Sequence, residues 1–163
     1  MYIEILLPGD DKEISEMSKM ATAILRDYYD PIIGKAQNDY MLGIFQSEDA
    51  IRDQLSHGYR YYFVRENNTN LGFFAFYPRE GALYLSKLYL YKDQRGKGYS
   101  WQILEMLKTQ AKELDLNRIE LNVNKNNPTK YIYERLGFMV AREEKNDIGN
   151  GFYMDDYVYA LKV

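Results

Sequence analysis

The sequence contains no cysteine and only one histidine. Without a thiolate, the chain cannot form disulfides, zinc ribbons, iron-sulfur clusters or CxxC redox pairs. A Ser-His-Asp arrangement would have to use His57, and HExxH or other multi-histidine metal sites are excluded. We therefore expect chemistry that needs neither a metal ion nor a reactive thiol.

Long apolar runs are also absent. No stretch approaches the roughly 18 uncharged apolar residues that a membrane helix needs. The first residues, Met1–Pro8, lack the basic region of a secretory signal. The sequence thus predicts a cytoplasmic protein that has no membrane partner.

The composition is that of a folded domain. Of the 163 residues, 46% are apolar, 28% charged and 15% aromatic. A chain of this length buries enough surface to hold a core without metals or disulfides. No linker, repeat or low-complexity tract interrupts it, so we expect a single domain over residues 1–163.

The charge is unevenly divided along the chain. Residues 1–60 carry 11 acidic and 6 basic side chains, a net charge of −5, whereas residues 61–163 carry 13 and 15, a net charge of +2. An acidic first part disfavours a nucleic-acid partner and suits a cationic one, while the mildly basic remainder can hold a phosphate-bearing ligand. Solvated helix faces are the more common explanation of such charges.

Hydrophobic periodicity divides the first part of the chain into helices and strands. The expected elements are a strand at Tyr2–Leu7, an amphipathic helix at Asp10–Tyr29 ended by Pro31, a helical region at Lys35–Leu55 broken near Gln46-Ser47, and strands at Tyr59–Arg65, Leu71–Tyr77 and Leu83–Tyr91. Gly58 is typical of a left-handed helix cap. The Asn67–Asn70 segment is a strong hairpin signal.

The second part contains a strand, a glycine-rich loop and a helix in direct succession. The loop is Lys92–Ser100, the helix carries an apolar stripe from Ile103 to Leu114, and a strand follows at Arg118–Val123. This order predicts a parallel strand pair with a right-handed crossover. Asn127-Pro128 then opens a short helix that stops at Gly137, before strands at Phe138–Glu144 and Phe152–Leu161.

The glycine-rich loop indicates a phosphate site, because a turn at a helix N-terminus presents unpaired N–H groups. The Walker A pattern is absent, and in a dinucleotide fingerprint the third glycine would be Trp101, which is too large. The segment from Arg95 to Ser100 instead resembles the acyl-CoA loop of the GNAT N-acetyltransferase superfamily. Ser100 departs from the Gly or Ala of that pattern but is still small.

A second segment strengthens this resemblance. Asn126–Phe138 is similar to the family signature of an asparagine, a helix, a tyrosine at Tyr133 and a closing Gly-Phe pair. The resemblance is strong over Leu71–Val163, and the helical first part follows the layout of bacterial polyamine acetyltransferases. It implies an α/β (α+β) fold with a mixed, largely antiparallel sheet, a central splayed parallel pair and about four flanking helices.

The family's chemistry is the transfer of an acetyl group from acetyl-CoA directly to a primary amine of a small cationic molecule or peptide, without a metal. Tyr133 matches the family's tyrosine that protonates the departing thiolate. Asn126, or Asn127 beside it, either contacts the pantetheine arm or closes the helix. The resemblance assigns the remaining cofactor contacts to the backbone of Leu88, Tyr89 and Leu90 for pantetheine and the thioester carbonyl, and to the loop residues Arg95, Gly96, Lys97, Gly98, Tyr99 and Ser100 for the pyrophosphate.

The general base is open. Many relatives place a glutamate on the central strand, but the corresponding Leu85–Lys87 stretch offers none. The candidates that remain are Glu120, His57, Asp155, Asp156 or a water chain between tyrosines.

Two alternative functions and one assembly also follow from the sequence. A non-catalytic acyl-CoA sensor of the same fold would keep the loop without the chemistry, and a dinucleotide-binding oxidoreductase would use the same glycines. The aromatic-rich final strand could pair or pack across a two-fold axis, so a homodimer is an expected assembly.

Overall fold

The computed structural model describes residues 1–163, which form seven strands, five α-helices and one short 3-10 helix. In chain order, the elements are β1 (Tyr2–Ile5), α1 (Asp11–Ile33), α2 (Lys35–Gln46), α3 (Glu48–Ser56), β2 (Arg60–Glu66), β3 (Thr69–Arg79), β4 (Ala82–Leu90), η1 (Lys92–Gln94), α4 (Tyr99–Glu113), β5 (Arg118–Asn124), α5 (Lys130–Arg135), β6 (Met139–Gly149) and β7 (Phe152–Lys162). None of the helices is long and apolar enough to cross a membrane.

The strands are hydrogen-bonded in the order β1-β2-β3-β4-β5-β7-β6. The β1/β2, β2/β3, β5/β7 and β6/β7 pairs are antiparallel. The β4/β5 pair is parallel, and its register joins Ala82–Tyr84 to Arg118–Glu120. The mixed, largely antiparallel sheet with one parallel pair is therefore confirmed, with five α-helices against the four or so expected.

The chain divides into two compact units. The N-terminal unit comprises Met1–Tyr77 and Lys87–Tyr99, and the C-terminal unit comprises Pro78–Ser86 and Ser100–Val163. Strand β4 contributes its second half to the first unit and its first half to the second. Each unit is described by itself below.

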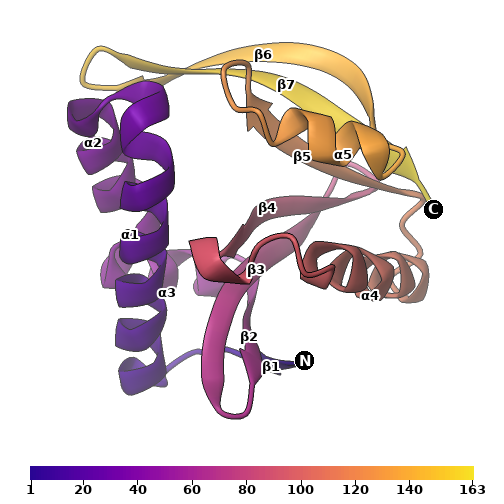
Figure 1. Cartoon of the computed structure of the whole chain (residues 1–163), viewed down its shortest axis with the longest axis horizontal. Helices are drawn as coiled ribbons and strands as arrows, with labels where there is room; N and C mark the ends of the chain where they lie inside the picture. The colour runs from indigo at the N-terminus through magenta and orange to yellow at the C-terminus, as the bar shows by residue number, and fades with distance from the viewer. The chain divides into compact units, whose positions relative to one another are not determined.

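The core of the N-terminal unit lies where three helices pack on strands β2 and β3 (Figure 1). Helix α1 supplies the largest share of its buried side chains, at the helical spacing expected from the sequence. The fully or almost fully buried members of this core include Leu6, Ile14, Met17, Ala21, Ile24, Ile51, Tyr61, Phe63, Phe73 and Ala75.

Helix boundaries follow the capping chemistry of the sequence, with one exception. The Asp10 side chain accepts a hydrogen bond from the Glu13 N–H, and Ser47 accepts one from the Ala50 N–H, both at 3.2 Å. The break at Gln46-Ser47 is thus confirmed. The expectation that Pro31 ends the first helix is wrong: α1 continues to Ile33. Pro31 lies in the last turn, and the Gly34 N–H still reaches Asp30 O at 3.0 Å.

The hairpin between β2 and β3 forms where the asparagines predict it. Asn67 and Asn68 adopt positive φ angles of 52° and 60°, as a two-residue type I′ turn requires. Gly58 is also left-handed, with a φ of 92°, directly after the end of α3. Both turns were readable from the residue types alone.

The C-terminal unit is built around strands β5, β7 and β6, and β6 and β7 form a long hairpin (Figure 1). The hairpin strands extend further than expected, since only Asn150-Gly151 separates them, with φ angles of 55° and 78°. Helix α5 begins at Lys130, two residues later than expected. Asn127 nevertheless caps this turn, because its Oδ1 accepts a hydrogen bond from the Thr129 N–H at 2.9 Å.

Candidate functional site

The glycine-rich loop lies in the N-terminal unit and leads into helix α4. Gly96 and Gly98 adopt φ angles of 75° and 85°, which side chains with a Cβ rarely adopt. Both glycines and Lys97 are exposed. This geometry gives an open turn of backbone N–H groups at a helix N-terminus, an arrangement suited to phosphate oxygens.

Side chains of the same loop attach it to other residues of the N-terminal unit. The Arg95 Nε donates to the Leu90 carbonyl at 3.1 Å, and its guanidinium lies 4.7 Å from the centre of the Tyr28 ring. The Tyr99 hydroxyl donates to Glu66 at 2.9 Å, and Lys97 Nζ donates to Gln94 Oε1 at 3.3 Å. Arg95 therefore positions the loop as well as adding positive charge, a role that the sequence did not reveal.

The segment Leu88–Leu90 on β4 also lies in the N-terminal unit. It is held by contacts of the Tyr89 side chain and by close packing of its backbone on β3. The Tyr89 hydroxyl hydrogen-bonds to that of Tyr29 at 3.1 Å, and its ring packs on Phe73 with centroids 5.7 Å apart. On β3, a Cβ placed at Gly72 would lie 2.2 Å from the Tyr89 carbonyl oxygen. The backbone that the resemblance assigns to the thioester arm is thus held closely against β3.

Tyr133 lies in the C-terminal unit on helix α5, in a partly exposed position. Its ring meets Phe138 edge to face, with centroids 5.6 Å apart, and its carbonyl accepts the Phe138 N–H at 3.1 Å. The Gly-Phe pair of the motif therefore anchors the tyrosine. Tyr131, two residues earlier on the same helix, is 54% exposed.

The two asparagines before this helix differ in surroundings. Asn127 is 3% exposed, and its side chain caps Thr129 as described above. Asn126 is exposed, and its backbone N–H donates to Asn124 Oδ1 at 2.9 Å. Asn127 thus holds the turn that precedes α5, whose N-cap residue is Thr129, and Asn126 stays the candidate for contact with a cofactor.

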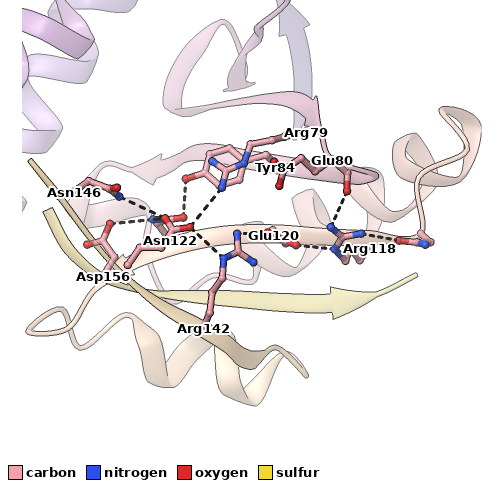
Figure 2. A network of polar contacts seen from close by, with 11 residues as sticks. Arg79, Glu80, Tyr84, Arg118, Glu120, Asn122, Arg142, Asn146 and Asp156 are labelled. Carbon is pink, nitrogen blue, oxygen red and sulfur yellow. Dashed lines mark hydrogen bonds and ion pairs between the residues drawn. The ribbon is translucent and has the colours of Figure 1, made fainter. Parts of the chain in front are cut away.

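A polar network covers one face of strands β4, β5, β7 and β6 in the C-terminal unit (Figure 2). At its centre, Asn122 Nδ2 donates to Glu144 and to Asp156 at 3.2 Å each, and its Oδ1 accepts the Tyr84 hydroxyl at 2.8 Å. The Arg79 guanidinium lies 4.5 Å from the centre of the Tyr84 ring. The sequence did not predict this network, because its members come from five separate strands, including Arg79 at the end of β3.

Two buried carboxyls in this network have pKa values that are shifted in opposite directions. Burial alone would raise the pKa of Glu120, but hydrogen bonds from Arg118 at 2.7 Å and Arg142 at 3.1 Å outweigh it and hold the pKa below its usual value. Asp156 has no arginine. Burial raises its pKa, the Asn122 amide only partly opposes this, and the neighbouring Glu144 charge adds to it. Of these two carboxyls, Asp156 is therefore the one whose pKa is raised.

Replacing Asp156 by asparagine is expected to stabilise the protein at pH 7 by about 1 kcal/mol. A carboxyl whose pKa is raised in the folded state opposes folding when ionised, so the cost is present at neutral pH. It disappears as the pH falls through the pKa of the unfolded carboxyl, where both states are protonated. Urea denaturation at pH 7 and pH 4 measures the difference; a variant that is less stable at pH 7 would contradict this electrostatic account.

The other base candidates lie in exposed or ion-paired positions. His57 is exposed, and its Nδ1 lies 2.7 Å from the Asp53 carbonyl at the end of α3, so it has a structural contact at the negative end of the helix dipole. Asp155 forms an ion pair with Lys125 at 3.1 Å.

Lys87 is a residue whose importance the sequence analysis missed. It lies on β4 directly before Leu88, yet it is only 8% exposed. Burial lowers the pKa of its amine to about 7. The signal was present in the sequence, since a lysine within the mostly apolar run Leu83–Leu90 is unusual for a buried strand.

Comparison with known proteins gives a consistent result. The family model described as "Acetyltransferase (GNAT) domain" matches residues 33–157, which is more than half of the chain. No curated protein sequence matches the chain. The family assignment therefore stands on the domain model, and the solved structures add evidence on the fold.

Several solved structures share this fold at low sequence identity. A PaiA N-acetyltransferase from Thermoplasma acidophilum in complex with coenzyme A is 17% identical, with 100% of both chains covered and a TM-score of 0.78. A GNAT family acetyltransferase from Elizabethkingia anophelis with acetyl-CoA bound is 17% identical, with 99% of this chain and 97% of that chain covered and a TM-score of 0.66. An aminoglycoside 6′-acetyltransferase type Ii is 14% identical, with 99% and 97% covered and a TM-score of 0.70.

Proposed function

Because the chain belongs to the acetyltransferase (GNAT) domain family, we propose that it is an N-acetyltransferase that transfers the acetyl group of acetyl-CoA to a primary amine. The observation that supports the cofactor most directly is the exposed Gly96–Gly98 turn at the start of α4. Two fold relatives were solved with coenzyme A or acetyl-CoA bound. We propose that residues 1–163 act as one such domain, without a metal cofactor.

The donor is held by backbone groups and by charge. The N–H groups from Gly96 to Ser100 take the pyrophosphate, and Lys97 adds a charge-assisted contact. The Leu88–Leu90 backbone binds the pantetheine arm, and an N–H of this strand polarises the thioester carbonyl. Asn126 contacts the same arm.

Tyr133 has one role in the proposed reaction, which is to protonate the departing thiolate. After the amine nitrogen attacks the carbonyl carbon, the carbon–sulfur bond breaks and the thiolate needs a proton. A phenol of pKa about 10 and a thiol of pKa about 8.5 are close enough for this transfer. The acetyl group passes directly to the amine, with no covalent intermediate on the protein.

We propose that the acceptor is a small cationic molecule or a peptide amine. The net charge of −5 over residues 1–60 favours a cationic ligand over an anionic one. An aminoglycoside acetyltransferase is among the fold relatives. The final strand, β7, is paired with β5 and β6 on its two edges, so it cannot pair with a second copy. We therefore propose that two copies associate through β6, which is the last strand of the sheet and whose Met139 side chain is 75% exposed.

A sensor that binds acyl-CoA without catalysis is the second candidate. It is favoured by the absence of a glutamate from the Leu85–Lys87 stretch, where many relatives have their base. A sensor needs no proton donor, so substitution of Tyr133 would leave acyl-CoA binding unchanged. The wild-type sensor would itself show no turnover.

Thiol release from acetyl-CoA, measured across a panel of spermidine, spermine, aminoglycosides, amino acids and short peptides, tests the proposed function. The protein has no cysteine, so it adds no background to a thiol reagent. Turnover with one amine class is the expected result. Silence across the panel, with acetyl-CoA still raising the melting temperature, would favour the sensor, and stabilisation by NAD but not by acetyl-CoA would favour an oxidoreductase.

A further inference from the structure

Lys87 is a buried amine without a counter-charge. Its Nζ donates to Gln54 Oε1 at 2.8 Å and lies 5.3 Å and 5.2 Å from the ring centres of Tyr59 and Tyr61. These three side chains face the amine: Gln54 from α3, Tyr59 from the residue directly before β2, and Tyr61 from β2. None of them is a carboxylate.

Such surroundings disfavour the charged form of the amine. A buried ammonium group is costly unless a carboxylate pairs with it, and ring faces and one amide oxygen compensate only part of that cost. Gln54 Oε1 also accepts the Tyr61 hydroxyl, so it is shared between two donors. Burial lowers the pKa of Lys87 to about 7, which leaves a large neutral fraction at physiological pH.

The side chains next to Gln54 include a buried oxygen atom that can accept a further hydrogen bond. The Gln54 amide donates to the Phe45 carbonyl at 2.8 Å, and the Gln46 amide donates to the same carbonyl at 2.6 Å. The other end of Gln46 is different: its Oε1 is buried and accepts no hydrogen bond. Buried acceptors without a partner are rare, and they are typical of places where water or a ligand binds.

The position of Lys87 in the chain links it to the proposed chemistry. It immediately precedes Leu88–Leu90, the backbone proposed above to hold the thioester, and both belong to the N-terminal unit. We propose that Lys87 accepts the proton of the acceptor's ammonium group, in place of the carboxylate that this strand lacks. This inference rests on the proposed function, because a proton acceptor matters only if an amine is acetylated.

The proton balance is complete without further reagents. The acceptor ammonium gives one proton to Lys87 Nζ, and its nitrogen lone pair then forms the C–N bond as the C–S bond breaks. The second proton of the amine replaces the one that Tyr133 gives to the thiolate. Lys87 then releases its proton to water. The Tyr59 ring centre lies 5.3 Å from Nζ and this side chain is partly exposed, so we place the entry of the proton beside the ring.

Replacement of Lys87 by methionine tests this role. Methionine has a similar length and removes a buried charge, so the melting temperature is expected to be unchanged or higher. We expect kcat to fall about 100-fold, with the KM for acetyl-CoA within about twofold of wild type. The matched control is Lys35→Met, which removes an exposed lysine of α2 that pairs with Asp39 and should keep wild-type kcat.

A second variant separates proton transfer from a structural role. Gln54→Glu places a carboxylate beside Nζ, which favours the charged amine and raises its pKa. Since only neutral Lys87 accepts a proton, the acid limb of the kcat/KM profile should move to higher pH by about one unit or more. A structural role would not move this limb.

The outcomes are distinguishable. A Lys87→Met enzyme with wild-type kcat, or a folded Gln54→Glu enzyme with an unmoved acid limb, would overturn the role of Lys87 while leaving the acetyltransferase intact. A wild-type protein that acetylates no amine would overturn the proposed function, and this inference with it.

Discussion

Replacing Tyr133 by phenylalanine is expected to lower kcat about 100-fold. The substitution removes only the hydroxyl that we propose protonates the thiolate, and the edge-to-face contact with Phe138 is kept. The dissociation constant of acetyl-CoA should stay within about twofold of the wild-type value, because the proposed cofactor contacts are made by backbone groups of other segments. Steady-state thiol release gives kcat, and calorimetric titration with coenzyme A gives the affinity.

Tyr131 provides the matched control for this experiment. It lies on the same short helix but is largely exposed, so Tyr131→Phe should keep the wild-type kcat. Equal kcat values for wild type and Tyr133→Phe would remove Tyr133 from the mechanism. A loss of coenzyme A affinity equal to the loss of kcat would assign it to binding instead.

Gly72→Ala is expected to lower the free energy of unfolding by about 3 kcal/mol or more. A Cβ at this position would lie 2.2 Å from the Tyr89 carbonyl oxygen and 2.8 Å from Leu90 Cα, and these backbone atoms cannot rotate away. The strand must shift, so the stabilisation of the protein by acetyl-CoA should also be lost. Urea denaturation with and without acetyl-CoA measures both effects.

Gly43 on helix α2 is the control for the glycine substitution. No atom lies within 4 Å of a Cβ built there, and alanine is the better helix former by about 1 kcal/mol. Gly43→Ala should therefore be neutral or stabilising. A Gly72→Ala protein as stable as wild type would show that β3 and β4 do not approach as closely as described.

Local signals predicted much of the fold because they act through neighbouring residues. The Ser47 cap, the Asn67-Asn68 turn and the left-handed Gly58 each depend on the preferences of one or two residues. Pro31 misled the prediction, because proline limits the backbone of the residue before it without always ending a helix. The ends of β6 and β7 were also missed, since pairing across the hairpin, rather than local preference, sets their length.

The glycine loop and the Tyr133 motif were readable because their members are close in sequence. The surroundings of Lys87 and Asp156 could not be predicted, for the opposite reason. The environment of Lys87 depends on Gln54 and Tyr61, and that of Asp156 on Asn122 and residues of other strands. A pKa depends on these long-range neighbours, so no local pattern gives it.

The most direct test of the account follows the acetyl group itself. Wild-type protein is incubated with acetyl-CoA carrying an isotopically labelled acetyl group and with the amine that gives the highest thiol release, and mass spectrometry then follows the label. The account predicts one labelled, acetylated amine for each free coenzyme A. It also predicts that turnover requires no labelled protein intermediate. Binding of acetyl-CoA without any labelled amine, across the whole acceptor panel, would contradict it.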